Sequence, residues 1–311
     1  MLIDNLFLGF RVVIPIFTIV ILGHLTARRG LVKPGSFIDM NNLVFTLFIP
    51  AHLFYSIAGG NVENVLDFKF LGIVLALILV MTAILLLIIP RLEKDPKKIG
   101  VMIQGIYRTN FVILGFPILT SLYGPSILDL GASILLISMP VFNILSITIL
   151  GYYTGKKTDL RTMLAAVIKS PLVIATLLGM LAMPFTLPSV IQDTMRLLSQ
   201  VSTPLALFVL GGLLDMKGVG ANWRDLNIVM IARLIIVPLV FLHLAHLLGF
   251  HEQQLMTLMV FSAAPTAVVS YSMTLYLGGD DRLAQQIILY TTALSVFTYV
   301  FWIYYVLTFL A

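Results

Sequence analysis

The chain has 311 residues, of which 59% are hydrophobic and only 11% are charged, and it contains no cysteine. About a quarter of the residues in a soluble domain are charged, so this composition excludes an ordinary water-facing surface. It also excludes a disordered chain and a disulfide-stabilised scaffold. The net charge of +5 is not accompanied by a cluster of basic and aromatic residues outside the apolar runs, so we expect no nucleic-acid partner. The composition predicts an all-α polytopic membrane protein with the lipid bilayer as its surroundings.

Ten mostly apolar runs are long enough to cross a bilayer as helices, since a spanning helix needs about 20 residues. They cover residues 5–26, 37–58, 69–90, 99–122, 129–153, 165–186, 191–214, 226–249, 254–277 and 284–308. These runs do not alternate apolar and polar residues as the strands of a membrane β-barrel do. Asp4 precedes the first run without a basic segment before it, so we expect no cleaved signal peptide.

Basic residues in alternate loops predict the orientation, because short cytoplasmic loops are enriched in Lys and Arg. These loops carry Arg28, Arg29, Lys33, Arg91, Lys94, Lys97, Lys98, Lys156, Lys157, Arg161, Lys169, Lys217, Arg224 and Arg282. The charged residues in the opposite loops are mostly acidic. We therefore expect a multi-pass protein with both termini outside the cytoplasm.

The two halves of the chain share a pattern of Pro and Gly residues. The matched pairs are Pro15 with Pro171, Gly23 with Gly179, Pro50 with Pro204 and Pro117 with Pro265. The pairs occur in the same order at a nearly constant separation, which indicates a first five-helix repeat over 1–154, a short cytoplasmic connection over 155–164 and a second repeat over 165–311. Because five is odd, the second repeat lies inverted in the membrane. Inverted repeats are typical of secondary transporters.

The fourth and ninth runs are the repeat-related pair that is expected to form discontinuous helices with a binding site near the membrane midplane. Gly115 and Pro117 interrupt the fourth run and Pro265 interrupts the ninth, because proline cannot donate a backbone hydrogen bond and its ring opposes the preceding turn. A broken helix exposes free amides at the N-terminus of one half, and these amides favour an anion. This pair of helices is therefore the expected binding site.

Polar residues near these breaks are the candidate site residues, and each has two interpretations. A cation in the bilayer is costly, so Arg108 is expected to face protein or water. It either contacts an anionic substrate or attracts anions in the inner vestibule, or else it snorkels to the inner surface or forms a salt bridge with a neighbour. Asn110 either binds a ligand or forms a hydrogen bond to another helix. The further candidates are Asn143, Thr266 and Ser270.

Other polar residues in the runs favour structural roles. Arg233, in the eighth run, is expected to snorkel or to pair with a neighbour. His243, His246 and His251 have spacings that could suit a metal, but they lack a cysteine or a nearby carboxylate pair, so we expect no metal site and no cofactor. No Asp or Glu lies near the middle of any run, so a buried carboxylate that carries protons is not evident.

Four segments together resemble the auxin efflux carrier family, which includes plant PIN carriers and many bacterial permeases. These segments are NNLVFTLFIPAHLF (41–54), RTNFVILGFPILTSLYG (108–124), TPLALFVLGGLL (203–214) and SAAPTAVVSYSMTLYLGGD (262–280). The resemblance covers nearly the whole chain. Plant members have a long loop between the fifth and sixth helices, and this chain does not, so it is similar to the bacterial members and is expected in a bacterial cytoplasmic membrane.

The resemblance implies ten helices in two inverted repeats, with helices one, two, six and seven as a scaffold and the other six as a mobile transport part. It implies that helices four and nine cross at Pro117 and Pro265, and that Asn110 lies near the carboxylate of the substrate. It is also compatible with a homodimer formed through the scaffold.

The sequence thus predicts a transporter of small organic anions, secondary active or facilitative, that works by elevator-like alternating access and is not an enzyme. One alternative is a sodium-coupled symporter resembling the bile acid transporter group. Another, of a different class, is a channel. The substrate, the direction of transport and the driving ion stay open at this point.

Overall fold

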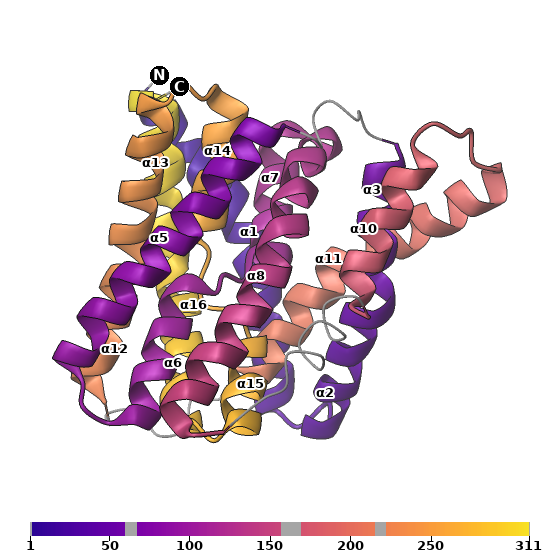
Figure 1. Cartoon of the computed structure of the whole chain (residues 1–311). Coiled ribbons are helices and arrows are strands. Elements are labelled where there is room, and N and C mark those ends of the chain that lie inside the picture. Colours follow the sequence, from indigo (N-terminus) through magenta and orange to yellow (C-terminus); the bar gives the residue numbers. More distant parts are fainter. Residues whose placement is uncertain (1, 60–66, 157–168, 215–221, 311) are drawn as a thin grey trace.

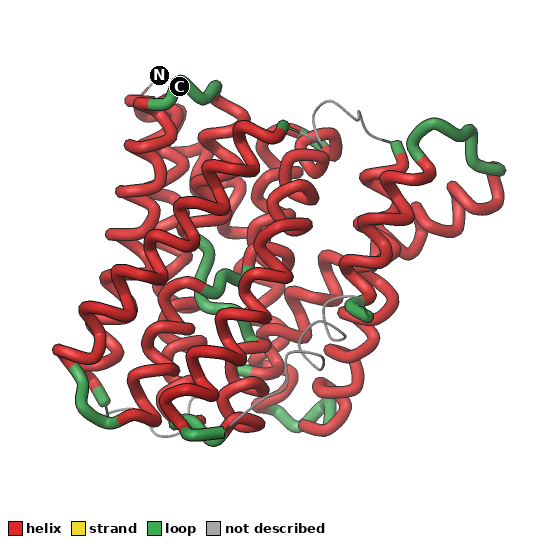
Figure 2. The backbone as a smooth tube through the Cα atoms, viewed as in Figure 1, coloured by secondary structure: helices red, strands yellow, loops and turns green. Residues whose placement is uncertain are grey.

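The computed structural model describes residues 2–59, 67–156, 169–214 and 222–310, and all regular secondary structure in these ranges is helical (Figures 1 and 2). Seven helical segments are long and apolar enough to cross a membrane: Asp4–Arg28, Gly35–Ala58, Phe68–Leu92, Pro125–Thr154, Ser189–Leu213, Trp223–Leu247 and Asp281–Leu310. Two shorter apolar helices cover Phe111–Tyr123 and Pro171–Ala182. The chain is therefore an all-helical, multi-pass membrane protein, as its composition predicts.

The three remaining predicted runs do not form long continuous helices in the described residues. The run 99–122 contains α6 (Pro96–Tyr107) and α7 (Phe116–Tyr123), and the run 254–277 contains α14 (Glu252–Ala263) and α15 (Val269–Leu277). Both are therefore broken, as expected. The run 165–186 contains α10 (Pro171–Ala182), while its first residues lie outside the described ranges, as do Lys157, Arg161, Lys217 and most of the predicted connection 155–164.

One group of packed helices consists of α1 (Leu2–Arg28), α2 (Pro34–Leu43), α3 (Ile49–Ala58), α10 and α11 (Ser189–Leu213). Within it α11 packs against α1, α2 and α3, and α10 packs against α3 (Figure 1). Helices α1 and α11 approach backbone to backbone: a Cβ atom added to Gly23 would lie 1.9 Å from the carbonyl oxygen of Phe208, and one added to Gly211 would lie 1.8 Å from that of Val20. Small residues permit such close packing between membrane helices.

The other helices form a second group, in which α6 packs against α5 (Phe68–Leu92), α8 (Leu128–Thr154) and α16 (Asp281–Tyr305), and α14 packs against α13 (Val237–Leu247) and α16. Helix α12 (Trp223–Ile231) contacts α6 and α16, α15 contacts α8 and α16, and α7 contacts α8 and α14. Helix α1 contacts α16 and α7 as well, so it lies where the two groups meet (Figure 1).

Three π-helical turns each end two residues before a proline. They are η1 (Val44–Phe48) before Pro50, η2 (Phe111–Gly115) before Pro117 and η4 (Ala232–Ile236) before Pro238. Proline lacks the N–H group that would bond to the preceding turn, and a wider turn relieves the clash with its ring. At Pro238 the carbonyl left free is that of Leu234, which accepts a hydrogen bond of 2.8 Å from Trp302 Nε1. These prolines are therefore accommodated inside continuous helical segments.

The two ends of the molecule differ in charge. At the end with the chain termini, Asn5 donates to the carbonyl of Leu307, and Asp67 and Glu252 accept hydrogen bonds from Gln254 and Tyr123 (Figure 1). At the other end the basic residues join neighbouring helices. Lys98 forms a 3.1 Å salt bridge with Asp225, Arg224 donates to Leu92, and Lys156 donates to Tyr276. Lys98, Arg224 and Lys156, three of the basic residues expected in alternate loops, thus lie at the same end of the fold.

Candidate functional site

The two broken helices meet at their breaks, which run antiparallel. One break covers residues 108–110, between α6 and η2, and the other covers 264–268, between α14 and α15. Thr109 and Thr266 form an isolated antiparallel bridge. The amide of Asn110 donates to the carbonyl of Pro265 at 2.8 Å, and the amide of Ala267 donates to that of Arg108 at 3.1 Å. The two segments, far apart in the sequence, therefore hold one another through their backbones.

Two threonine side chains at the crossing also donate hydrogen bonds to carbonyls at the ends of the two broken helices. Thr109 Oγ1 donates to the carbonyl of Phe261 in the last turn of α14, at 2.9 Å. Thr266 Oγ1 donates to the carbonyl of Gly105 in the last turn of α6, at 2.6 Å. The last carbonyls of a helix lack intrahelical partners, and in a bilayer each must find one within the protein. Each threonine therefore caps the helix from the other half of the chain.

The expected place of the break in the fourth run was wrong. Pro265 lies at the crossing, but Pro117 lies in the first turn of α7 and Gly115 ends the π-helical turn before it. Gly115 instead permits close packing, because a Cβ atom there would lie 2.5 Å from the Phe111 ring and 3.0 Å from Val260. The π-helical turn absorbs the proline, so the helix breaks earlier, at Arg108 to Asn110. The crossing therefore pairs Thr109 with Thr266, and not Pro117 with Pro265.

Arg108 lies buried at the crossing, with 3% of its surface exposed, and its guanidinium bonds to α8. Nη2 donates to Asn143 Oδ1 at 2.9 Å, and Nη1 donates to Ser146 Oγ at 2.8 Å and to the carbonyl of Phe142 at 3.2 Å. Nη1 also lies 3.2 Å from Met273 Sδ on α15. Arg108 therefore does not snorkel to the surface. The structure brings Arg108 and Asn143, both predicted site residues, into direct contact.

Arg233, on the π-helical turn η4, is the second arginine at the crossing. It is 1% exposed and does not snorkel either. Nε donates to the carbonyl of Ala264 at 2.7 Å, Nη1 to that of Ile106 at 2.8 Å and Nη2 to that of Phe261 at 3.2 Å. Sequence reasoning treated this residue as peripheral, because nothing in its own segment shows that two helix ends converge on it.

Two predicted site residues have polar atoms that are buried without a hydrogen-bond partner in the described part of the chain. These atoms are Asn110 Nδ2 and Ser270 Oγ. Asn110 is 5% exposed and directly precedes the first turn of η2, and Ser270 is 3% exposed in the first turn of α15. Buried polar groups normally have partners, so these two atoms are suited to a polar ligand. The hydroxyl of Thr266, in contrast, is already engaged with Gly105.

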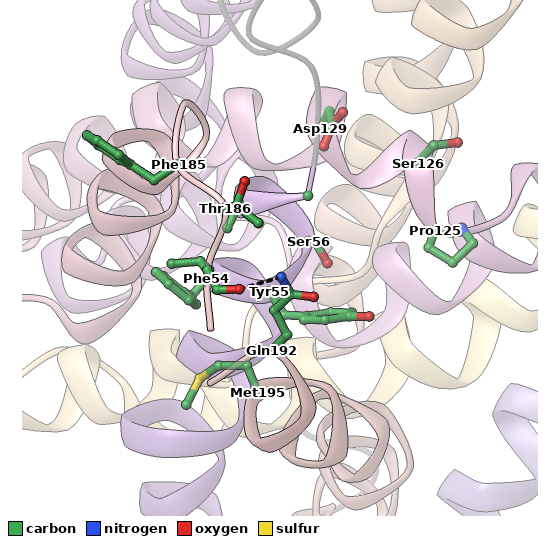
Figure 3. Close-up of a pocket in the computed structure, with 13 residues that line it drawn as sticks. Phe54, Tyr55, Ser56, Pro125, Ser126, Asp129, Phe185, Thr186, Gln192 and Met195 are labelled. Atoms are coloured by element: carbon green, nitrogen blue, oxygen red, sulfur yellow. Dashed lines mark hydrogen bonds between the residues drawn. The ribbon is translucent and has the colours of Figure 1, made fainter. Parts of the chain in front are cut away.

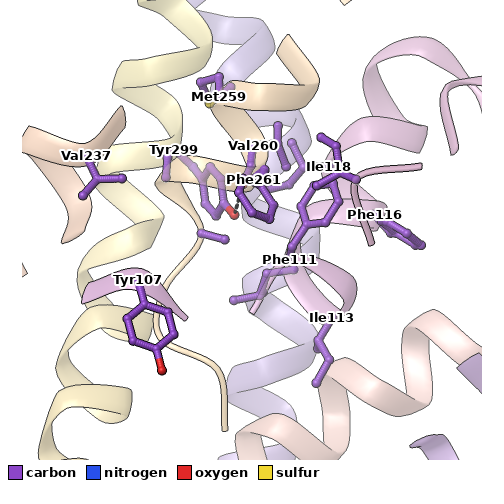
Figure 4. Close-up of a cluster of buried hydrophobic side chains, with 14 of the residues drawn as sticks. Tyr107, Phe111, Ile113, Phe116, Ile118, Val237, Met259, Val260, Phe261 and Tyr299 are labelled. Atoms are coloured by element: carbon purple, nitrogen blue, oxygen red, sulfur yellow. Dashed lines mark hydrogen bonds between the residues drawn. The ribbon is translucent and has the colours of Figure 1, made fainter. Parts of the chain in front are cut away.

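An aromatic cluster surrounds the crossing (Figure 4). Phe111 makes edge-to-face contacts with Phe116 and Phe261, with ring centroids 5.3 Å apart in both pairs. Phe142 stacks on Phe261 at 6.0 Å and lies 5.7 Å from Tyr107. Rings on α6, η2, α7, α8 and α14 thus surround the polar backbone of the breaks with apolar side chains, and charged interactions are stronger in such a low-dielectric environment.

Two cavities lie between the two helix groups, one toward each end of the molecule. The larger, about 640 Å³, is bounded by the end of α3, the start of α8 and the α10–α11 connection, with Ser56, Thr186 and Gln192 in its wall (Figure 3). The smaller, about 240 Å³, lies between α2, α11, α15 and α16 and includes Asn41, Asn42 and Gln285. Val268, in the second break, also lines the smaller cavity, which therefore reaches the crossing.

In the described residues, no group of three or more His, Asp or Glu side chains is placed to hold a metal ion. The salt bridges within the described ranges join Lys98 to Asp225 and Arg196 to Asp193. Neither Arg108 nor Arg233 therefore has a carboxylate partner within the described ranges.

Comparison with known proteins gives two findings. Residues 8–160 and 157–303 match a protein family described as "Membrane transport protein". The chain is also 26% identical over 306 residues to an uncharacterized transporter of Methanocaldococcus jannaschii, an alignment that covers 94% of this chain and 96% of that protein.

Proposed function

The chain belongs to the membrane transport protein family of the auxin efflux carrier type, and we propose from this and from its site that it is a secondary active or facilitative transporter of small organic anions. The family and the relative indicate a transport protein and not an enzyme.

One observation carries the choice of an anion: two buried guanidinium groups, Arg108 and Arg233, lie at the same crossing as the unpartnered side-chain amide of Asn110, and neither has a carboxylate partner in the described residues. A buried cation without a counter-ion is costly, and an anionic ligand supplies the missing charge. Helical segments η2 and α15 also begin at the crossing, and the positive N-terminal end of a helix favours an anion. We assign Asn110 Nδ2 and Ser270 Oγ as donors to the substrate carboxylate.

The proposed mechanism is alternating access between the two cavities. The scaffold consists of α1, α2, α3, α10 and α11, and the remaining helices form the part that moves. Both cavities lie where these two groups meet, one toward each end of the molecule, which supports access from both sides of the membrane. The reciprocal capping by Thr109 and Thr266 supports ten helices in two inverted repeats. The basic end is proposed to face the cytoplasm, with both termini outside it, in the cytoplasmic membrane.

Counterflow into proteoliposomes tests this function. Vesicles containing the purified protein and loaded with an unlabelled organic acid should accumulate the same labelled acid, with saturable kinetics, when a panel of mono- and dicarboxylates is screened. Vesicles without protein are the control. Conduction without saturation or counterflow would indicate a channel, and transport that requires a sodium gradient would indicate a symporter. No transport of any carboxylate, combined with transport of cations, would overturn the proposal.

A further inference from the structure

Arg233 links the ends of both broken helices although it belongs to neither. Its three side-chain nitrogens donate to the carbonyls of Ile106, Phe261 and Ala264, at 2.7 to 3.2 Å. Ile106 lies in the last turn of α6, and Phe261 and Ala264 lie in and just after the last turn of α14. A single buried cation is thus placed against two converging helix C-termini.

These two C-termini create an electrostatic problem for an anion site. The C-terminus of a helix carries the equivalent of about half a negative charge. Helices α6 and α14 both end at the crossing, so together they place about one negative charge beside the unpartnered Asn110 Nδ2. The guanidinium of Arg233 carries one positive charge and contacts both ends, and therefore offsets them. What then remains at the crossing is positive: the N-termini of η2 and α15, and Arg108.

We propose that Arg233 is a positioning residue that determines charge selectivity at the crossing: it neutralises both helix C-termini, so that the site accepts carboxylates, and it does so without contacting the substrate. This inference rests on the proposed function and adds to it which residue makes the site selective for anions. Arg108 differs from Arg233. Its guanidinium bonds to Asn143, Ser146 and the carbonyl of Phe142 on α8, and to no carbonyl at the C-terminus of either broken helix.

Isothermal titration calorimetry on the purified full-length protein tests the inference. The ligands are short dicarboxylates of two to six carbons and the monoamides of these acids. The dicarboxylate that binds most tightly is compared with its own monoamide, which has the same skeleton and one charge fewer. For a substrate charge taken to lie about 10 Å from the guanidinium, at an effective dielectric constant of about 20, loss of the Arg233 charge weakens binding roughly tenfold for each substrate charge. Arg233→Gln should therefore lose about tenfold more affinity for the dicarboxylate than for the monoamide.

Two further variants separate charge from structure. Arg233→Lys keeps the charge but has fewer fixed donors, so it should unfold at a lower temperature while it retains the preference for the dicarboxylate. Arg224→Gln, nearer the basic end of the same membrane span, is the matched control and should leave both affinities unchanged. Since Arg233→Gln is the variant most prone to misfolding, Arg233→Lys keeps the inference testable.

The outcomes distinguish the inference from the proposed function. If the unmodified protein binds none of these acids, the proposed function fails and this inference fails with it. If the unmodified protein prefers the dicarboxylate and Arg233→Gln weakens both ligands by the same factor, Arg233 is only structural and this inference alone is overturned. Loss of the preference in Arg233→Lys, which retains the charge, would overturn it as well.

Discussion

Thr109 and Thr266 cap each other's helices: each hydroxyl donates to a carbonyl in the last turn of the broken helix that carries the other residue. Each bond runs from one half of the chain to the other, so the two bonds are counterparts, but the carbonyls that accept them have different surroundings. The carbonyl of Phe261 receives a second hydrogen bond, from Arg233, whereas Thr266 is the donor that the structure gives to the carbonyl of Gly105. The two threonines are therefore not equivalent in energy.

Thr266→Val should destabilise the protein more than Thr109→Val. Losing the hydroxyl of Thr266 leaves the buried carbonyl of Gly105 unpaired, which costs about 1–3 kcal/mol, while Phe261 retains the bond from Arg233. Thermal unfolding of the purified variants measures the difference. Thr82→Val is the matched control, because the Thr82 hydroxyl bonds only within its own helix, to Ile78, and is also buried. Equal losses for the two crossing variants would contradict this account.

Asn110→Ala should abolish carboxylate binding and transport while the protein stays as stable as the unmodified chain. The reason is that Asn110 Nδ2 has no partner in the described structure, so its removal breaks no hydrogen bond. Calorimetry and proteoliposome uptake measure function, and thermal unfolding measures stability. Asn227→Ala, on α12 in the wall of an apolar groove beside α5, is the control and should change neither. Full transport by Asn110→Ala would remove Asn110 from the site.

Gly23→Ala and Gly211→Ala should each prevent α1 and α11 from packing. The added methyl group would overlap a backbone carbonyl, which cannot rotate away as a side chain can, so each change should cost at least about 1–3 kcal/mol. Gly72→Ala is the matched control, because no atom lies within 4 Å of a Cβ added there, and alanine in a helix is favoured over glycine by about 1 kcal/mol. The yield of monodisperse protein and its thermal unfolding temperature are compared between the Gly23→Ala, Gly211→Ala and Gly72→Ala variants. A Gly23→Ala protein as stable as Gly72→Ala would refute the close contact.

Single-cysteine variants should report the two cavities from opposite sides of the membrane. The chain contains no cysteine, so no background has to be removed. In sealed vesicles of known orientation, a membrane-impermeant maleimide should label Ser56→Cys, in the larger cavity, only from the side of the chain termini, and Ser272→Cys, in the smaller cavity, only from the other side. Ser138→Cys is the control, since Ser138 is fully buried and should not be labelled.

A transported carboxylate should change the two labelling rates in opposite directions, because alternating access opens one cavity as it closes the other. Labelling of Ser56→Cys and Ser272→Cys from the same side would contradict the proposed topology. Rates that rise together with substrate would contradict alternating access.

The sequence predicted the helical membrane fold and the two broken helices. Apolar runs of about 20 residues are a local property, and in a bilayer the backbone has few ways other than a helix to satisfy its polar groups. The structure places Arg108 and Asn110 in the first break, Asn143 in contact with Arg108, and Ser270 in the first turn of α15. Their assignment as substrate ligands stays a prediction.

The position of the break in the fourth run was predicted wrongly, because Pro117 alone appeared sufficient to interrupt a helix. Its effect depends on whether the preceding turn can widen, and η2 does so. The same relation holds at Pro50 and Pro238, where π-helical turns also precede the proline. An alignment of the repeats on Thr109 and Thr266, rather than on the prolines, would have located the crossing.

By itself, the sequence determined that this chain is a helical membrane protein with polar residues at two interrupted helices, since hydropathy and helix-breaking residues act over a few turns. Only the tertiary structure decided that Thr109 meets Thr266 and that Arg233 contacts both helix ends. Two of these contacts join residues more than a hundred positions apart: the 2.6 Å bond from Thr266 to Gly105 and the 2.8 Å bond from Arg233 to Ile106. They depend on how whole helices pack, and no local pattern of residues encodes that.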